Sequence, residues 1–339
     1  MELEHYQAIA LYGFIGAFAF GAIASRTHFC TMGAVSDWVN MGSLTRLRVW
    51  FLAIGVCILG AQLLQYLGLV DLSQSIYLTT NFTWFGHVLG GIIFGIGMTL
   101  GSGCGQRTVV RVGGGNLKSL VVLLVMAITA YTTLRGLLAL VRLQINGPTT
   151  IDLADKGLSG QGIPEMVSAA TGISPAVSAA LVTLLIAGSM IMFALREREV
   201  RTSFDNLLAG IGLGAIIVGA WYVTGHLGFD EFDPLPVEGY SFIAPVGNAL
   251  TYVMTFTGST INFGIAVVFG LLAGSFAYSV VSGSFRIESF NDRSDLVNHL
   301  AGGFLMGFGG VMSLGCTIGQ GITGMSTLAL GSLITLVFI

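Results

Sequence analysis

The sequence predicts an all-α polytopic membrane protein with about nine transmembrane helices and short re-entrant half-helices. Of its 339 residues, 54% are hydrophobic and only 9% are charged. The mean hydropathy of +0.84 lies outside the range of soluble domains of this length. Apolar runs long enough to cross a bilayer recur along the chain, and glycine-rich breaks interrupt some of them. These observations together define the fold class.

Nine apolar runs are candidates for transmembrane helices, at a rise of about 1.5 Å per residue. They are residues 8–25, 49–70, 82–103, 117–141, 174–195, 206–225, 259–282, 297–315 and 325–339. The glycine-rich breaks lie at 28–33, 103–115 and 315–324. Because a backbone in lipid must form its hydrogen bonds within the protein, these breaks must be enclosed by protein or face a cavity. We interpret them as the starts of half-helices.

The basic residues predict how the chain is oriented. Eleven of the 14 Lys and Arg residues fall on one side of the nine-run arrangement and three on the other. By the positive-inside rule the first side is cytoplasmic, so we expect an N-terminus outside the cell and a cytoplasmic C-terminus. The net charge of −3 is spread without a basic block, so nucleic acid is not expected as a partner.

One apolar run occurs twice. HVLGGIIFGIGMTLGSGC, from His87, aligns without a gap with HLAGGFLMGFGGVMSLGC, from His299, 212 positions later. The first four runs then correspond to the last four, and the fifth connects them. An odd number of spans between equivalents inverts the second copy, an arrangement typical of transporters whose substrate site lies between the repeats. We therefore expect a first inverted repeat at 1–142, an outer loop and connector at 143–205, and a second repeat at 206–339.

Three of the four cysteines occupy the breaks. Cys57 lies in the uninterrupted run AIGVCILGAQ, where a buried structural thiol is the ordinary interpretation. Cys30 lies in HFCTMGAVSDW, Cys104 in GSGCGQRTVVRVGGG and Cys316 in SLGCTIGQGITG. We predict that Cys30, Cys104 and Cys316 line the substrate path.

The surroundings of these cysteines favour an anion. A half-helix that starts just after a cysteine directs unpaired N–H groups and its positive dipole end inward. Arg107 and Arg111 lie four residues apart on one face and can attract an anion, although contact with lipid headgroups is an alternative. The residues expected to support the three cysteines are Gly103, Gly105, Gln106, Arg107, Arg111, Gly315, Thr317 and Gln320.

Three segments resemble the cysteine motifs of the YeeE/YedE membrane proteins. They are Phe-Cys-Thr-x-Gly-Ala at 29–34, Gly-Ser-Gly-Cys-Gly-Gln-Arg at 101–107 with Gly-Gly-Gly-Asn at 113–116, and Gly-Cys-Thr-Ile-Gly-Gln-Gly at 315–321. The resemblance covers nearly the whole chain, and the family includes thiosulfate uptake transporters of the bacterial inner membrane. It implies that a sulfur-containing anion passes the three cysteines, with Cys104 closest to the middle. It also implies a small cytoplasmic partner similar to the sulfurtransferase TusA, while other members serve different sulfur or selenium compounds.

Several mechanisms fit these residues. Neutral thiols can donate weak hydrogen bonds to thiosulfate and pass it between sites without trapping it. The main rival is a membrane-embedded sulfurtransferase that cleaves thiosulfate through a cysteine persulfide. A neutral-solute channel of the aquaporin type also uses inverted repeats, but no Asn-Pro-Ala pair occurs here. A three-thiolate metal site lacks CxxC or His-x-x-x-His spacing, so we expect no metal and no cofactor.

Overall fold

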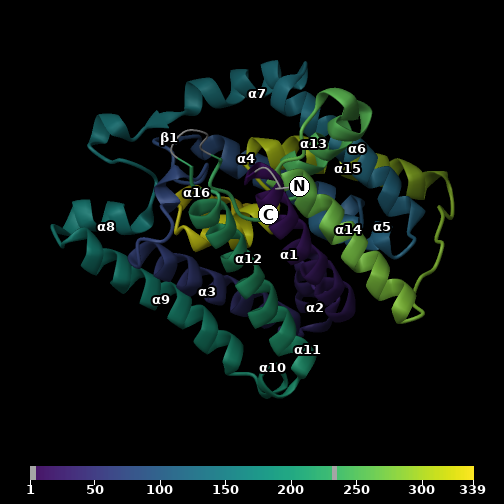
Figure 1. The fold of residues 1–339 in the computed structure, drawn as a ribbon, viewed down its shortest axis with the longest axis horizontal. Helices are drawn as coiled ribbons and strands as arrows, with labels where there is room; N and C mark the ends of the chain where they lie inside the picture. The colour runs from purple at the N-terminus through teal and green to yellow at the C-terminus, as the bar shows by residue number, and fades with distance from the viewer. Residues whose placement is uncertain (1–4, 231–234) are drawn as a thin grey trace.

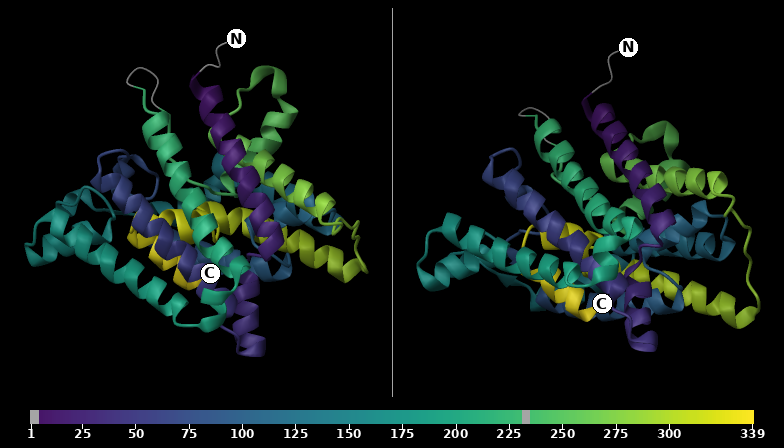
Figure 2. Two further views of the ribbon diagram at one scale, coloured as in Figure 1. Left: turned by 60° about the horizontal axis from the view of Figure 1, so that its bottom comes forward. Right: turned by 90° about the horizontal axis from the view of Figure 1, so that it is seen from below.

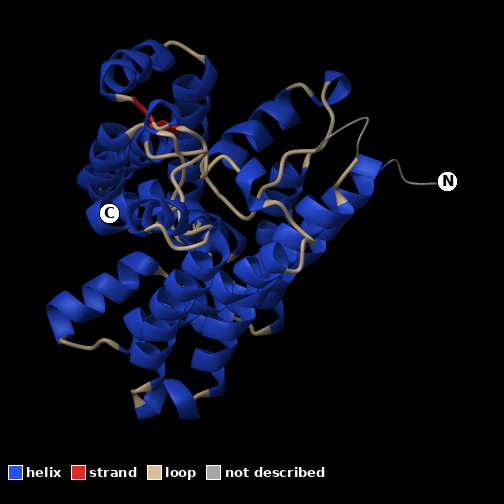
Figure 3. Cartoon of the chain, turned by 90° about the vertical axis from the view of Figure 1, so that its left-hand side faces the viewer, coloured by secondary structure: helices blue, strands red, loops and turns tan. Residues whose placement is uncertain are grey.

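The computed structural model describes residues 5–230 and 235–339, and its regular structure is almost entirely helical (Figures 1 and 3). The first part of the chain forms α1 (His5–Thr27), α2 (Thr31–Met41), α3 (Thr45–Tyr66), α4 (Trp84–Leu100), α5 (Gly105–Gly113), α6 (Leu117–Arg135) and α7 (Leu138–Asn146). The middle part forms α8 (Ile163–Thr171), α9 (Pro175–Leu195) and α10 (Arg198–Thr202). The last part forms α11 (Phe204–Leu207), α12 (Leu213–Tyr222), α13 (Ala244–Met254), α14 (Phe263–Val281), α15 (Arg293–Met312) and α16 (Leu330–Phe338). The strands β1 (Asn81–Phe82) and β2 (Ile151–Asp152) form one short antiparallel pair.

The prediction of an all-α polytopic membrane protein is confirmed. Seven helical segments of the described chain are long and apolar enough to cross a membrane, and they coincide with the first seven predicted runs. The last two predicted runs hold α15 and α16, which do not belong to this set. The nine residues of α16 rise only about 13 Å, less than half of a bilayer core of about 30 Å. The helix Leu330–Phe338 by itself is therefore shorter than a span.

Small residues let the central helices pack with their backbones in contact. α1 lies along α14, and α4 lies along α15 (Figure 1). A Cβ added to Gly274 would stand 1.9 Å from the carbonyl oxygen of Phe18, so α14 has no room for a side chain at this position. Without a hydrophobic driving force between helices in lipid, such close backbone contact is a main source of helix association.

The outer helices carry the surface that faces the lipid. α9 packs on α3 at the edge of the molecule (Figure 1) and exposes leucines on its other side. These are Leu181, Leu184 and Leu185, between 55% and 73% exposed. A row of exposed leucines on a 21-residue apolar helix is stable in hydrocarbon and not in water. This face therefore meets the acyl chains.

Two helix contacts join pairs that are equivalent in the predicted alignment. α1 packs on α14, and α12 packs less extensively on α3. The 11-residue helix α13 follows the first span of the second half as the 11-residue α2 follows α1, although we predicted no helix at 244–254. The inverted repeats and their boundaries stay predictions.

One face of the molecule gathers basic residues. Figure 2 shows the start of α1 at one face and α2 at the opposite face, which also carries α10 and the connection between α14 and α15. Ion pairs tie this second face together: Arg26 with Asp205, Arg48 with Glu197, and Lys118 with Asp295. We call it the arginine-rich face.

Candidate functional site

Each of the three break cysteines precedes a new helical turn. Cys30 is the N-cap of α2, and its sulfur accepts a hydrogen bond from the N–H of Gly33 at 3.5 Å. Cys104 is the N-cap of α5. Cys316 lies three residues before the π-helical turn Gly319–Gly324, and the N–H of Gly319 donates to its sulfur at 3.4 Å. The half-helices that the sequence predicts after these cysteines therefore exist, but they are only 11, 9 and 6 residues long.

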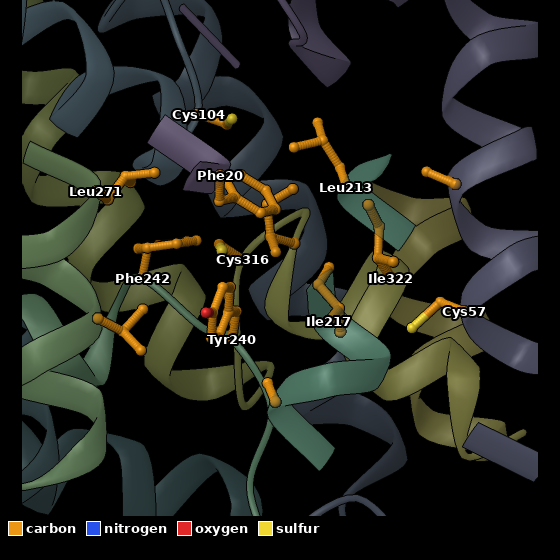
Figure 4. Close-up of a cluster of buried hydrophobic side chains, with 14 of the residues drawn as sticks. Phe20, Cys57, Cys104, Leu213, Ile217, Tyr240, Phe242, Leu271, Cys316 and Ile322 are labelled. Carbon is orange, nitrogen blue, oxygen red and sulfur yellow. The ribbon is translucent and has the colours of Figure 1, made fainter. Parts of the chain in front are cut away.

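The structure brings the three thiols together. The side chains of Cys30 and Cys104 lie near each other, and the side chain of Thr317 lies near Cys104. Cys316 is close enough for a charge on its sulfur to act on Cys104. Cys104 thus lies between the other two. Cys57 is buried in α3 near Ser326, and Figure 4 shows it apart from Cys104 and Cys316.

The same backbone conformation precedes each of the three cysteines, and no sequence signal predicts it. The residue two positions before each one adopts a left-handed conformation: His28 (φ 52°), Ser102 (φ 57°) and Leu314 (φ 62°). None of them is glycine, although a left-handed residue at the end of a helix is usually glycine. The left-handed residue ends the preceding helix and turns the chain so that the following cysteine points into the protein.

Three buried polar side chains beside the cysteines have no hydrogen-bond partner among the described residues. They are Thr31, which follows Cys30, Gln106, whose amide is fully buried two residues after Cys104, and Thr317, which follows Cys316. An unpartnered buried amide costs about 1–3 kcal/mol, so such groups are retained where they bind something. All three side chains can donate a hydrogen bond to an anion.

The remaining predicted support residues have different roles. Gln320 donates to the carbonyl of Ser313 and accepts from the hydroxyl of Ser332, both at 2.5 Å, so its amide fixes the loop around Cys316. At Gly105 and Gly315 an added Cβ would stand 3.2 Å from the Ile243 side chain and 3.1 Å from the Gln320 N–H. These two glycines keep the breaks narrow. Gly103 contacts only the side chain of Arg107, at 3.3 Å from an added Cβ.

A cavity of about 560 Å³ opens on the arginine-rich face, and we call it the arginine vestibule. Four arginines from three segments of the chain line it: Arg46 of α3, Arg107 and Arg111 of α5, and Arg286 after α14. Of the four cysteines, only Cys30 lines it as well. Arg107 lies near enough to both Cys30 and Cys104 for their charges to interact. The predicted pair of arginines is therefore at the mouth of the cysteine path, and Arg46 and Arg286 join it.

An aromatic cluster covers Cys316 on the other side. Phe20, Tyr240 and Phe242 pack with ring centroids 5.8 to 6.5 Å apart, and all three are buried (Figure 4). The sulfur of Cys316 lies beside the backbone of Phe242. Cys104 and Cys316 have no exposed surface. In this conformation the path is open at Cys30 and closed beyond Cys316.

All four cysteines are free thiols. Among residues 5–230 and 235–339, no group of three or more His, Cys, Asp or Glu side chains is arranged to hold a metal ion. The chemistry available in the path is therefore that of thiols, hydroxyls, one amide, backbone N–H groups and arginine.

These features define a polytopic membrane protein with a buried thiol path and a cationic vestibule. The chain belongs to the sulphur transport family, whose model matches residues 26–339, and this confirms the resemblance to YeeE/YedE proteins. It is similar to a protein named thiosulfate transporter TsuA from Spirochaeta thermophila, with 26% identity over 335 residues, covering 96% of this chain and 94% of the relative. A protein of the same name from Escherichia coli is 26% identical over 348 residues, covering 98% of this chain and 92% of the relative.

Proposed function

We propose that this protein takes up thiosulfate, or a closely related sulfur-containing anion, across the inner membrane of a bacterium. Its family and two relatives named as thiosulfate transporters support the substrate class. The N-terminus is periplasmic and the arginine-rich face cytoplasmic, in agreement with the positive-inside rule. Residues 1–142 and 206–339 act as two inverted repeats about the site, joined by 143–205.

The observation that carries this proposal is the proximity of Cys30 and Cys104, with Thr317 also near Cys104. The anion passes Cys316, Cys104 and Cys30 in turn and then enters the arginine vestibule. Neutral S–H groups donate weak hydrogen bonds to the terminal sulfur or an oxygen of the ion. Because each bond is weak and the next donor is close, the ion is held at several places and trapped at none.

Other groups support the thiols along the path. The unpaired N–H groups at the start of α2 and α5 stabilise negative charge, and the Gln106 amide adds a donor beside Cys104. Arg107 draws the anion from Cys104 toward Cys30. On the cytoplasmic side, a small partner similar to TusA receives the sulfur compound as it leaves the vestibule.

Replacement of Cys104 tests the proposal. In vesicles that contain the protein, we expect Cys104→Ala to lower uptake of labelled thiosulfate by at least about tenfold, because a hydrogen bond to a charged group contributes about 1.5–3 kcal/mol. Cys104→Ser retains a donor and should keep part of the activity. Cys57→Ala is the matched control, since Cys57 is equally buried but lies outside the path, and it should transport normally.

The same assay separates transport from cleavage. A sulfurtransferase would use a thiolate to attack the outer sulfur of thiosulfate, break its S–S bond, release sulfite outside and keep a persulfide on cysteine. Mass spectrometry of the protein after turnover would show the added sulfur atom. Intact labelled thiosulfate inside the vesicles supports transport. Unchanged uptake in both Cys104 variants would contradict the thiol path.

A further inference from the structure

The arginine vestibule contains more positive charge than its neighbours neutralise. Arg46 pairs with Asp37 at 3.3 Å, and Arg111 donates to the carbonyl of Ser102 at 2.8 Å. The side chain of Arg286 forms no hydrogen bond or ion pair with the described part of the chain. The one carboxylate in the lining, Glu288, accepts a hydrogen bond from the amide of Asn116. A net positive cavity remains.

Its arginines stand at two depths. Arg107 is half-buried beside Cys30, and the guanidinium of Arg46 lies against the first turn of α2, 2.9 Å from where a Cβ on Gly33 would stand. Arg286 is exposed at the mouth. Backbone hydrogen bonds fix its segment, since the N–H of Arg286 donates to the carbonyl of Gly114 and Glu288 N–H to that of Gly115. The mouth arginine is therefore held over the end of α5.

The vestibule is large enough for an ion that retains part of its hydration shell. Since a water molecule occupies about 30 Å³, a cavity of about 560 Å³ holds a small anion together with part of its hydration shell. Guanidinium groups recognise oxyanions through paired N–H donors, and several of them in one concave site select for a doubly charged ion. Binding in such a wet, open site is reversible.

We propose that the arginine vestibule is a binding site for divalent tetrahedral oxyanions such as sulfate, held mainly by Arg286 and Arg46, and that its occupation from the arginine-rich side slows thiosulfate uptake. The second part rests on the proposed function, because it places the vestibule at the exit of the thiol path. An ion bound there repels a second anion that approaches from Cys30. Accumulated sulfate would therefore restrain further entry.

Sulfate binding is measured first, without transport. The purified protein in nanodiscs of neutral phosphatidylcholine is titrated with labelled sulfate. We expect saturable binding that Arg286→Gln weakens about tenfold, the loss of one charge-assisted hydrogen-bonding group. Arg46→Gln should act in the same direction. Arg293→Gln is the matched control, since Arg293 is an exposed arginine of the neighbouring helix end outside the vestibule, and it should bind sulfate normally.

Inhibition is measured next, in right-side-out membrane vesicles loaded with sulfate. Internal sulfate should slow thiosulfate uptake by the unmodified protein, and the concentration for half-inhibition should rise about tenfold in Arg286→Gln. Sulfate binding that is equal in the parent and in both vestibule variants would overturn the proposal. Failure of the proposed function looks different: thiosulfate uptake would be absent, while Arg286-dependent sulfate binding would persist.

A lipid phosphate has the same chemistry as a free oxyanion, so the nanodisc composition separates the two. Phosphatidylglycerol is added to the phosphatidylcholine discs and the sulfate titration is repeated. Retained binding supports a free anion as the ligand. Complete loss would show that a headgroup occupies the vestibule and would overturn the assignment to soluble sulfate.

Discussion

Gly90 and Gly309 face each other where α4 crosses α15, with each backbone against the other. A Cβ on either residue would stand 2.7 Å from the carbonyl oxygen of its partner. Gly97 and Gly302 form a second such pair, at 3.0 and 2.8 Å. In the predicted repeat Gly90 corresponds to Gly302 and Gly97 to Gly309. The two glycine pairs are therefore equivalent to each other in the alignment. These two helices hold the break of Cys104 and the break of Cys316 at a fixed separation.

This contact predicts a stability effect. Gly309→Ala forces α4 and α15 apart, and we expect a loss of about 1–3 kcal/mol, the usual cost of overpacking. Thermal unfolding in detergent measures it as a lower Tm. Gly188→Ala is the control, because nothing lies within 4 Å of a Cβ there and alanine favours a helix over glycine. Its Tm should stay the same or rise. An equal fall in both variants would contradict the close contact.

A substitution of Gln106 is expected to change stability and transport in opposite directions. Its buried amide has no protein partner, so Gln106→Leu should raise the free energy of unfolding by about 1 kcal/mol while it lowers thiosulfate uptake. Stability and uptake are measured on the same preparation.

The comparison residue for this test is Gln161. It is equally buried, but its side-chain oxygen accepts a hydrogen bond from the N–H of Gly331 at 3.2 Å. Gln161→Leu should therefore destabilise the protein, because it leaves that N–H without its partner. If Gln106→Leu also lowers the Tm, its amide has a structural role and not the one assigned here.

The ion pair of Lys118 with Asp295 predicts a dependence on pH. The Lys118 ammonium, 2.7 Å away, donates to the Asp295 carboxylate and holds its pKa below the ordinary value, and the N–H of Asn291 adds to this. A depressed folded-state pKa contributes stability that is complete above the unfolded pKa of about 4 and is lost as the pH falls through the folded value.

The measurement is the Tm between pH 6 and 3, with Asp295→Asn beside Asp155→Asn. The Tm of Asp295→Asn should fall less at low pH than the Tm of the parent protein. The second removes an exposed carboxylate that has no partner in the described structure, and its profile should match the parent. Identical profiles in all three proteins would show that the ion pair contributes nothing measurable.

Hydropathy and glycine spacing were enough to predict the helical membrane fold and the positions of the breaks. Runs of apolar residues must be helical in lipid, so α1, α3 and α9 follow from the sequence directly. The short helix α13 was missed because 11 residues do not make a span. The length of α16 was overestimated because apolar composition continues through the turn before Leu330.

At the site, the three cysteines could be predicted because each occupies a break in an apolar run. The geometry of the vestibule could not be predicted. Arg46, Arg107 and Arg286 are separated by 61 and 179 positions, and only tertiary packing, such as that of α5 on α14, brings their segments together. The distribution of Lys and Arg predicts a basic side, but it does not predict which arginines share a cavity. The left-handed residues cannot be predicted either, since His28, Ser102 and Leu314 lack the glycine that usually marks such a position.

The three left-handed residues affect how rigidly the cysteine side chains are oriented. Each conformation costs about 1–2 kcal/mol, which glycine would avoid. A glycine, however, would let the same peptide swing through many orientations. Because a residue with a side chain stands at each bend, the turn is strained but also more rigid than a glycine turn. The rigid turns therefore limit how far the three sulfur atoms can move relative to one another.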